Sequence, residues 1–223
     1  MTKDLFLQAL TKYLAGVALV ALLLFLPAGT IHWPRGWLFI GALFIPMLGA
    51  GIVMMLKNPA LLRRRLNAKE KEMSQKQNIA LSGGMFVAGF ALAGLDYRFS
   101  WLQLPLWASL CAAALFLLGY GLFAEVLREN EYLSRTVEVQ AGQKVVDTGL
   151  YGLVRHPMYA ATLLLFLMMP LILGSVIALI PFLAYPAIIL RRIGNEEEVL
   201  ERELAGYSDY KRRVKHRLIP FIW

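Results

Sequence analysis

Stretches without charged side chains alternate with short polar segments along most of this chain. Four of these stretches are Tyr13 to Ala28, residues 36–56, Gln77 to Leu95 and Trp101 to Ala124. Each is close to the roughly 20 residues that a helix needs to cross a hydrocarbon core of ~30 Å. The pattern therefore predicts four transmembrane helices within residues 1–123, with a basic polar loop at residues 57–78.

A fifth uncharged stretch, residues 157–190, is too long for one membrane crossing. Gly174 and Ser175 lie near its middle, and three prolines interrupt the rest. Glycine and proline mark turns and helix ends. We therefore expect a helical hairpin with arms Tyr159 to Leu173 and Val176 to Leu190.

The segment from Asn195 to about His216 alternates between apolar and charged residues in the manner of an amphipathic surface helix. Asn195 is the expected N-cap, and the glutamates that follow it suit the positive end of a helix dipole. Gly206 is a possible break in this helix. The predicted fold class is thus an all-α integral membrane protein with four transmembrane helices, a membrane hairpin and a cytosolic C-terminal helix. We expect two regions, residues 1–123 and residues 124–223.

Composition agrees with a membrane protein, because 58% of the residues are hydrophobic and only 17% are charged. The net charge of +8 could suggest nucleic-acid binding, but the basic residues lie between apolar spans, where they set orientation. The single cysteine, Cys111, excludes an internal disulfide. Three scattered histidines, at positions 32, 156 and 216, favour no metal site.

The distribution of basic residues predicts the orientation. Residues 57–78, 124–157 and 191–217 contain seven, four and eight lysines and arginines, whereas the turns at 29–36 and 96–100 contain one each. Positively charged segments stay on the cytoplasmic side. The three basic regions are therefore expected to share the cytoplasmic face.

The most concentrated polar chemistry lies between Val145 and Tyr159. Tyr151, Arg155, His156 and Tyr159 fall close together, at a predicted helix start whose free N–H groups suit a polar or anionic ligand. The alternative is that these side chains only anchor a helix at the headgroup level. A second cluster follows the hairpin, where Arg192 and Glu196 share a helix face and could simply pair with each other. Motifs typical of soluble enzymes, such as Gly-rich nucleotide loops, His-Glu-x-x-His or Gly-x-Ser-x-Gly, are absent.

The two clusters together form a two-part motif that resembles the isoprenylcysteine carboxyl methyltransferase family and the related phospholipid methyltransferases. The motif reads Val146-x-x-Gly149-x-Tyr151-x-x-x-Arg155-His156-Pro157-x-Tyr159, then the hairpin, then Arg192-x-x-x-Glu196-Glu197-x-x-Leu200. The resemblance covers about the last 100 residues. One departure is Leu204-Ala205-Gly206-Tyr207, where the family often has Phe-Gly before paired tyrosines, so no role beyond Leu200 is carried over.

The resemblance implies a membrane-embedded methyltransferase that uses S-adenosyl-L-methionine without a Rossmann domain. The residues that it implies for cofactor binding are Gln143, Lys144, Val145, Val146, Tyr151, His156, Pro157, Met158, Tyr159 and Glu196. Arg192 takes the substrate-contacting position. We expect Arg192, together with Arg155, to hold a substrate carboxylate by bidentate hydrogen bonds.

The leading hypothesis is O-methylation of the carboxylate of a lipophilic, isoprenylcysteine-like substrate at the cytoplasmic face of a multi-pass membrane protein. The membrane would be the inner membrane of a prokaryotic cell or the endoplasmic reticulum of a eukaryotic one. Expected partners are a lipophilic small molecule or prenylated thiol and the membrane lipids. The alternatives are methylation of a lipid amine or a thiol, an NADPH-binding sterol-reductase-like protein, and a non-catalytic membrane scaffold.

Overall fold

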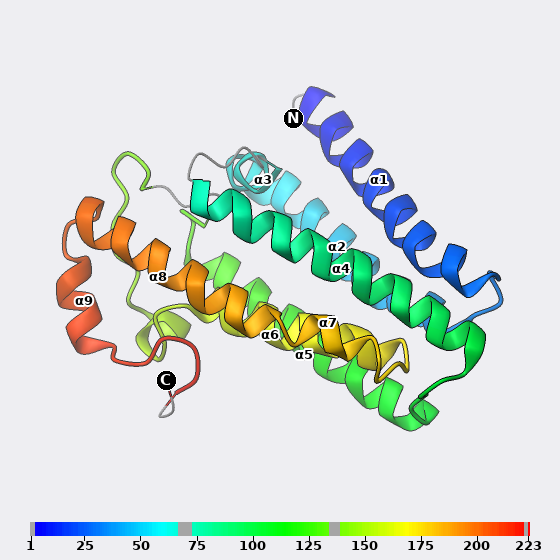
Figure 1. Cartoon of the computed structure of the whole chain (residues 1–223). Helices are drawn as coiled ribbons and strands as arrows, with labels where there is room; N and C mark the ends of the chain where they lie inside the picture. The colour runs from blue at the N-terminus through cyan, green and yellow to red at the C-terminus, as the bar shows by residue number, and fades with distance from the viewer. Residues whose placement is uncertain (1–2, 67–72, 134–138, 221–222) are drawn as a thin grey trace.

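The computed structural model describes residues 3–66, 73–133, 139–220 and 223, with the side chains of 73–76 left aside. Helices account for most of this part of the chain, and no named strand occurs in it, which confirms the all-α fold class. The helices are α1 (Lys3–Ala28), α2 (Pro34–Lys57), α3 (Pro59–Leu66), α4 (Met73–Phe99), α5 (Leu106–Glu129), the 3-10 turn η1 (Gly149–Gly152), α6 (Pro157–Ile172), α7 (Leu179–Phe182), α8 (Tyr185–Glu203) and α9 (Tyr207–Arg213). The long helices form one elongated bundle (Figure 1).

Four helices, α1, α2, α5 and the part of α4 from Gln77 to Phe99, are long and apolar enough to cross a membrane. They present many large apolar side chains outward, such as Leu26, which is 76% exposed. Surfaces of this kind are stable when lipid covers them. The four predicted spans are thus confirmed, and the chain is an integral membrane protein.

Several helix bounds differ from the sequence prediction; α1 begins at Lys3 rather than Tyr13, and α4 ends at Phe99 rather than Leu95. The segment 57–78 is not simply a loop, because α3 begins at Pro59, where the Asn58 side chain accepts a hydrogen bond from the Leu61 N–H at 3.0 Å. The fourth span begins at Leu106, later than predicted. The residues before it bind the tip of the hairpin instead of continuing the helix.

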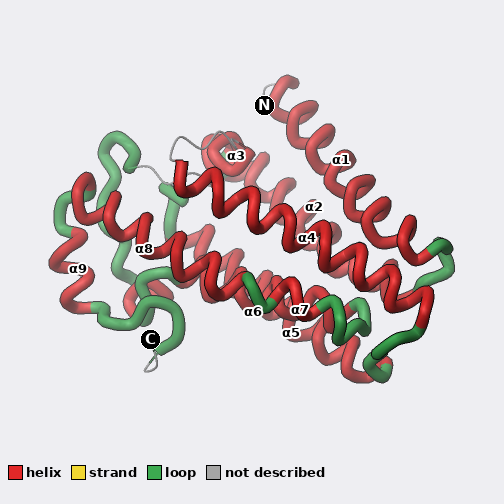
Figure 2. The backbone as a smooth tube through the Cα atoms, in the orientation of Figure 1, coloured by secondary structure: helices red, strands yellow, loops and turns green. Residues whose placement is uncertain are grey.

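The hairpin reaches the end of the bundle where α4 passes into α5. Its first arm is α6, and its tip is Gly174, which has a φ of +78°. The Leu104 N–H donates to the Gly174 carbonyl at 2.8 Å, and the Val176 N–H donates to the Leu102 carbonyl at 3.3 Å. Loops gather mainly at the two ends of the bundle, and the hairpin tip is at one of them (Figure 2). The hairpin tip therefore lies beside the residues that lead into α5.

The predicted helix from Asn195 to His216 is wrong in its bounds. Asn195 does not begin a helix, because α8 runs unbroken from Tyr185 to Glu203. Tyr185, Ile189 and Ile193 are buried at four-residue intervals along it, so one continuous stripe packs against the bundle. The chain then turns at Gly206, with a φ of +84°, into α9. The second arm of the hairpin thus extends directly into the polar end of the molecule.

Candidate active site

Segments distant in sequence meet at one end of the bundle, where α8, α9 and the loop between α5 and α6 lie together (Figure 1). Side-chain contacts bring the basic regions to this end as well. Arg64 of α3 donates to the Glu131 carbonyl at 2.5 Å, and Arg191 of α8 donates to Gln77 of α4 at 2.9 Å. The polar clusters that the sequence places in separate regions therefore share one end of the molecule.

A close contact between Glu129 and Gly149 positions Tyr151. Gly149 has a φ of +49°, and a Cβ atom built on it would lie 1.3 Å from Glu129 Oε1. Glu129 Oε2 accepts a hydrogen bond from the Leu150 N–H at 2.9 Å. Only glycine leaves room for this carboxylate and accepts this backbone conformation without strain. The close contact and the positive φ together favour glycine at position 149 of this chain.

Tyr151 is held from two sides. Its hydroxyl accepts a hydrogen bond from Asn130 Nδ2 at 2.9 Å, and its carbonyl accepts one from the Tyr210 hydroxyl of α9 at 2.8 Å. Burial, the largest cause, raises the pKa of the Tyr151 hydroxyl well above its usual range. Tyr151 is therefore a neutral side chain in a fixed position.

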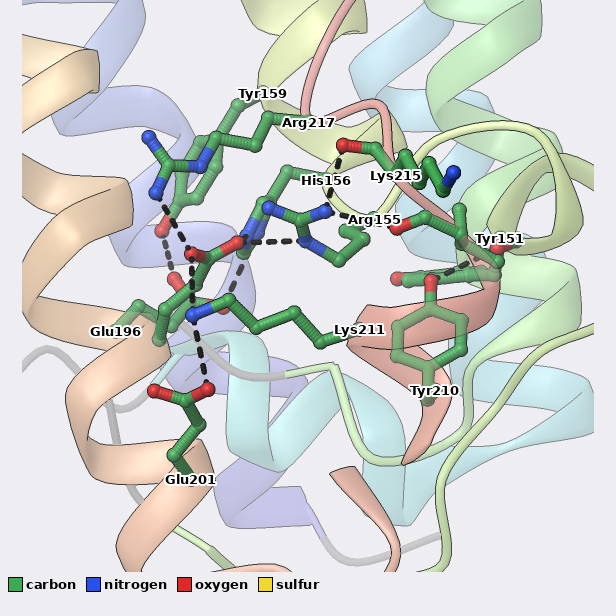
Figure 3. A network of polar contacts seen from close by, with 12 residues as sticks. Tyr151, Arg155, His156, Tyr159, Glu196, Glu201, Tyr210, Lys211, Lys215 and Arg217 are labelled. Carbon is green, nitrogen blue, oxygen red and sulfur yellow. Dashed lines mark hydrogen bonds and ion pairs between the residues drawn. The ribbon is translucent and has the colours of Figure 1, made fainter. Parts of the chain in front are cut away.

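Glu197 is the centre of a buried ionic network, and Figure 3 shows its partners Arg155, His156, Lys211 and Arg217. Its side chain is 3% exposed, and its Oε1 lies 2.8 Å from Arg155 Nε and 3.1 Å from His156 Nε2. Its Oε2 lies 3.2 Å from Arg217 Nη2 and 3.6 Å from Lys211 Nζ. Burial alone would raise the pKa of Glu197, but the hydrogen bonds and charges of His156 and Arg155 outweigh it and lower this pKa to about 2. Glu197 is thus ionised at any physiological pH.

Arg155 fastens the segment after α9 rather than pointing freely into the site. Its Nη1 donates to the carbonyls of Val214 and Lys215, both at 2.8 Å, while its Nε binds Glu197. The backbone N–H of Arg155 also donates to the His216 carbonyl at 2.9 Å. Because these groups are engaged within the protein, the geometry does not favour the predicted role of Arg155 as a second holder of a substrate carboxylate. We interpret it as a positioning residue.

Arg192 and Glu196 converge on the hydroxyl of Tyr159. This hydroxyl donates to Glu196 Oε2 and accepts a hydrogen bond from Arg192 Nε at 2.8 Å. The Glu196 side chain remains 23% exposed, unlike its neighbour Glu197. The helix spacing that suggested a simple Arg–Glu pair thus brings both side chains to a third residue, at the start of α6.

A cavity opens between these groups, with about 830 Å³ of empty space including its open mouth. Its walls contain Arg155, Arg192 and every residue assigned to cofactor binding by the resemblance except Pro157, which is buried in the first turn of α6. The lining residues with no predicted cofactor role are Asn130, Tyr132, Leu133, Leu200, Leu204, Tyr207 and Tyr210.

The sequence contains spacing patterns that point to the α9 tyrosines and to Glu197 as residues of this region. Tyr207 and Tyr210 are three residues apart, so they share a face of a helix. Glu197 continues the four-residue spacing of the buried stripe of α8, a pattern visible only once α8 is taken as one helix.

Comparison with known proteins supports the motif. Residues 110–202 match the model of the isoprenylcysteine carboxyl methyltransferase (ICMT) family, a stretch that runs from within α5 to near the end of α8. A 91-residue segment, 40% of the chain, is also 28% identical to Delta(14)-sterol reductase TM7SF2 of Mus musculus, of which it spans 22%. From residue 110 to residue 202 this membrane chain therefore matches the isoprenylcysteine carboxyl methyltransferase family, as its two-part motif predicts, and the family indicates a membrane methyltransferase.

Proposed function

We propose that this protein transfers a methyl group from S-adenosyl-L-methionine to the carboxylate of a lipophilic, isoprenylcysteine-like molecule. The observation that carries the proposal is the cavity where Glu196, Arg192 and the Tyr159 hydroxyl meet between the α5–α6 loop and α8. The family match over residues 110–202 supports the same reaction class.

The cavity lining fits a zwitterionic sulfonium nucleoside. Glu196 offers a partly exposed carboxylate for an ammonium group, and the rings of Tyr151 and Tyr159 suit a cation or an aromatic base. Val145 and Val146 add apolar wall. When bound, S-adenosyl-L-methionine supplies an electrophilic methyl group.

Arg192 is the residue proposed to hold the acceptor carboxylate. Its Nε is fixed by the Tyr159 hydroxyl, which orients the planar guanidinium for a two-point contact. A carboxylate acceptor is already ionised, so no general base is required and the residues act by positioning. The Tyr159 hydroxyl contacts both Arg192 and Glu196. It therefore fixes the proposed substrate-binding arginine relative to the proposed cofactor-binding glutamate.

The location of the site suits a substrate with a lipid tail. The site lies where α6 and α8 leave the apolar part of the bundle, so a polar head can reach Arg192 while an apolar tail stays among helices. The three basic regions at this end support a cytoplasmic orientation and contacts with anionic lipid headgroups.

The proposal is tested in two steps on protein purified in detergent. First, S-adenosylhomocysteine binding is measured by calorimetry for the wild type and for Glu196→Ala. We expect saturable binding that is weakened at least tenfold in the variant, since a charge-assisted contact is lost. Second, methyl transfer from radiolabelled S-adenosyl-L-methionine is measured with a prenylated cysteine and with fractionated membrane lipids.

The chemical stability of the labelled product identifies the acceptor. A carboxyl methyl ester releases methanol in base, whereas methylated lipid amines and thioethers do not. A base-stable product would show that the methyl acceptor is a lipid amine or a thiol and not a carboxylate. Binding without transfer to any acceptor would favour a non-catalytic scaffold.

The resemblance to a sterol reductase gives a second candidate, an NADPH-binding membrane protein. The same calorimetry with NADPH separates the two. Binding of NADPH, together with no binding of S-adenosylhomocysteine, would overturn the methyltransferase proposal.

A further inference from the structure

Tyr207 carries a buried hydroxyl that has no hydrogen-bond partner in the part of the chain that the structure describes. The residue begins α9, is 4% exposed and lines the cavity. Three other tyrosines of the cavity differ, because the hydroxyls of Tyr151, Tyr159 and Tyr210 are bonded within the protein. An unpaired buried hydroxyl destabilises a fold, so its presence in a cavity wall calls for an external partner.

The surroundings of Tyr207 keep its hydroxyl protonated. Burial, followed by the negative charges of Glu197 and Glu196, raises the pKa of this phenol far above its usual range. Ionisation of Tyr207 would place a third negative charge beside two carboxylates. The hydroxyl therefore has a proton to donate and lies in the electrostatic field of Glu196, the proposed ammonium partner.

We propose that the Tyr207 hydroxyl donates a hydrogen bond to the α-carboxylate of the methionyl part of the cofactor, an inference that rests on the proposed function. In an amino acid the ammonium and carboxylate groups are attached to the same carbon. A ligand that places its ammonium at Glu196 therefore places its carboxylate within a few bonds of it, where a neutral donor is more suitable than another acid. Tyr207 follows the family-matched segment 110–202 and extends the binding site into α9.

The substitution Tyr207→Phe tests this role because it removes only the hydroxyl. In the ligand-free protein we expect a melting temperature that is unchanged or higher, since an unpaired buried group is lost. S-adenosylhomocysteine should bind about tenfold more weakly, as expected for loss of a hydrogen bond to a charged group. The decarboxylated analogue of S-adenosylhomocysteine, which keeps the ammonium, should bind wild type and variant equally.

Tyr210→Phe is the matched control on the same helix. Its hydroxyl donates to the Tyr151 carbonyl, so its removal should lower the melting temperature of the ligand-free protein. A purely structural role for Tyr207 would give the same pattern as this control. Weaker ligand binding by Tyr207→Phe without a fall in its ligand-free melting temperature is therefore specific to a ligand contact.

Three outcomes would overturn the inference while the proposed function stands. They are wild-type affinity of Tyr207→Phe for S-adenosylhomocysteine, an equal loss for the decarboxylated analogue, and a fall in ligand-free stability like that of Tyr210→Phe. Failure of the wild-type protein to bind S-adenosylhomocysteine would instead reject the proposed function, and the inference with it.

Discussion

Neighbouring residues of the Glu196–Glu197 pair have different environments, and this difference decides what each can do. Glu197 is enclosed by cations from three segments, whereas Glu196 borders the cavity. The resemblance assigns Glu196 to the cofactor, but the sequence motif gives no role to Glu197 and does not show that it is buried. Which of the two glutamates is buried depends on the rotation of α8 about its axis. The burial of Ile193, four residues before Glu197, sets that rotation. The local pattern thus predicts the chemistry, and packing assigns it to individual side chains.

Replacement of Glu197 by Gln should destabilise the protein strongly. The variant leaves Arg155 and its neighbours without their counter-charge, and loss of one partner of a buried ion pair costs about 3–5 kcal/mol. The folded-state pKa of Glu197 is depressed to about 2 from 4.5. The contribution of Glu197 to the free energy of unfolding is therefore fully present above pH 4.5 and is lost as the pH falls toward 2. Thermal unfolding in detergent across this pH range should show the wild type and the variant converging.

The exposed neighbour provides the control for this measurement. Glu198→Gln should change the free energy of unfolding by no more than about 0.5 kcal/mol, as is usual for a surface site. A constant difference between wild type and Glu197→Gln down to pH 2 would contradict the ionic explanation.

Arg192 and Arg191 form a second matched pair. Arg192→Ala should lower the rate of methyl transfer about 100-fold, because its proposed partner is the substrate carboxylate, while S-adenosylhomocysteine affinity changes less than about twofold. Arg191→Ala removes a residue whose guanidinium binds Gln77 instead, and it should retain near wild-type turnover. Equal loss of turnover and cofactor affinity in Arg192→Ala would reject its assignment to the substrate.

At the scale of elements, the apolar runs predicted the four spans because burial in lipid leaves a long, uninterrupted signal. The expected second arm of the hairpin, Val176 to Leu190, is instead the short α7 followed by the first part of α8. The polar segments were less predictable. Asn195 has the chemistry of an N-cap, yet it lies within α8, because a helix already formed in the hairpin continues through it. Segment 57–78 contains α3 because Leu61 and Leu62 find buried positions that its charged composition conceals. Tertiary packing overrode local preference in both places.

The contact between α5 and η1 gives a prediction about one loop. Gly149→Ala should destabilise the protein by more than Gly142→Ala. Both glycines have positive φ, but a Cβ at Gly142 meets nothing within 4 Å, whereas a Cβ at Gly149 meets the Glu129 carboxylate. The control thus measures backbone strain alone, about 1 kcal/mol.

A double variant isolates the clash from other effects. Glu129→Ala combined with Gly149→Ala should be less destabilised than the sum of the two single variants, as measured by thermal unfolding. Strict additivity would show that the Glu129 carboxylate does not occupy the space beside Gly149.

For the molecule as a whole, the sequence regions 1–123 and 124–223 do not pack as independent units. Gly119 of α5 lies against Leu165 of α6, where an added Cβ would come within 3.0 Å. The hairpin tip binds the backbone of residues 102–104, and α3 binds the Glu131 carbonyl. The regions were separable in sequence because their chemistry differs, but the site depends on a scaffold built from both.

The orientation of the whole bundle in its membrane gives one further prediction. Single cysteines replacing Lys215 at the site end and Ser100 at the opposite end, in a Cys111→Ser background, should react with a membrane-impermeant maleimide from opposite sides. In right-side-out vesicles we expect labelling of position 100 only, and in inverted vesicles of position 215 only. Labelling of position 215 from outside would reverse the proposed orientation.

The contact of Glu129 with Gly149 also limits the order in which this sequence can change. A residue larger than glycine at position 149 meets the Glu129 carboxylate where it now lies, so this side chain must move away or be replaced by something shorter. Replacing position 129 first meets no such obstacle, because loss of the carboxylate leaves the Leu150 N–H without its acceptor. Evolutionary paths through this pair of positions are therefore expected to run in one direction, with position 129 changing first.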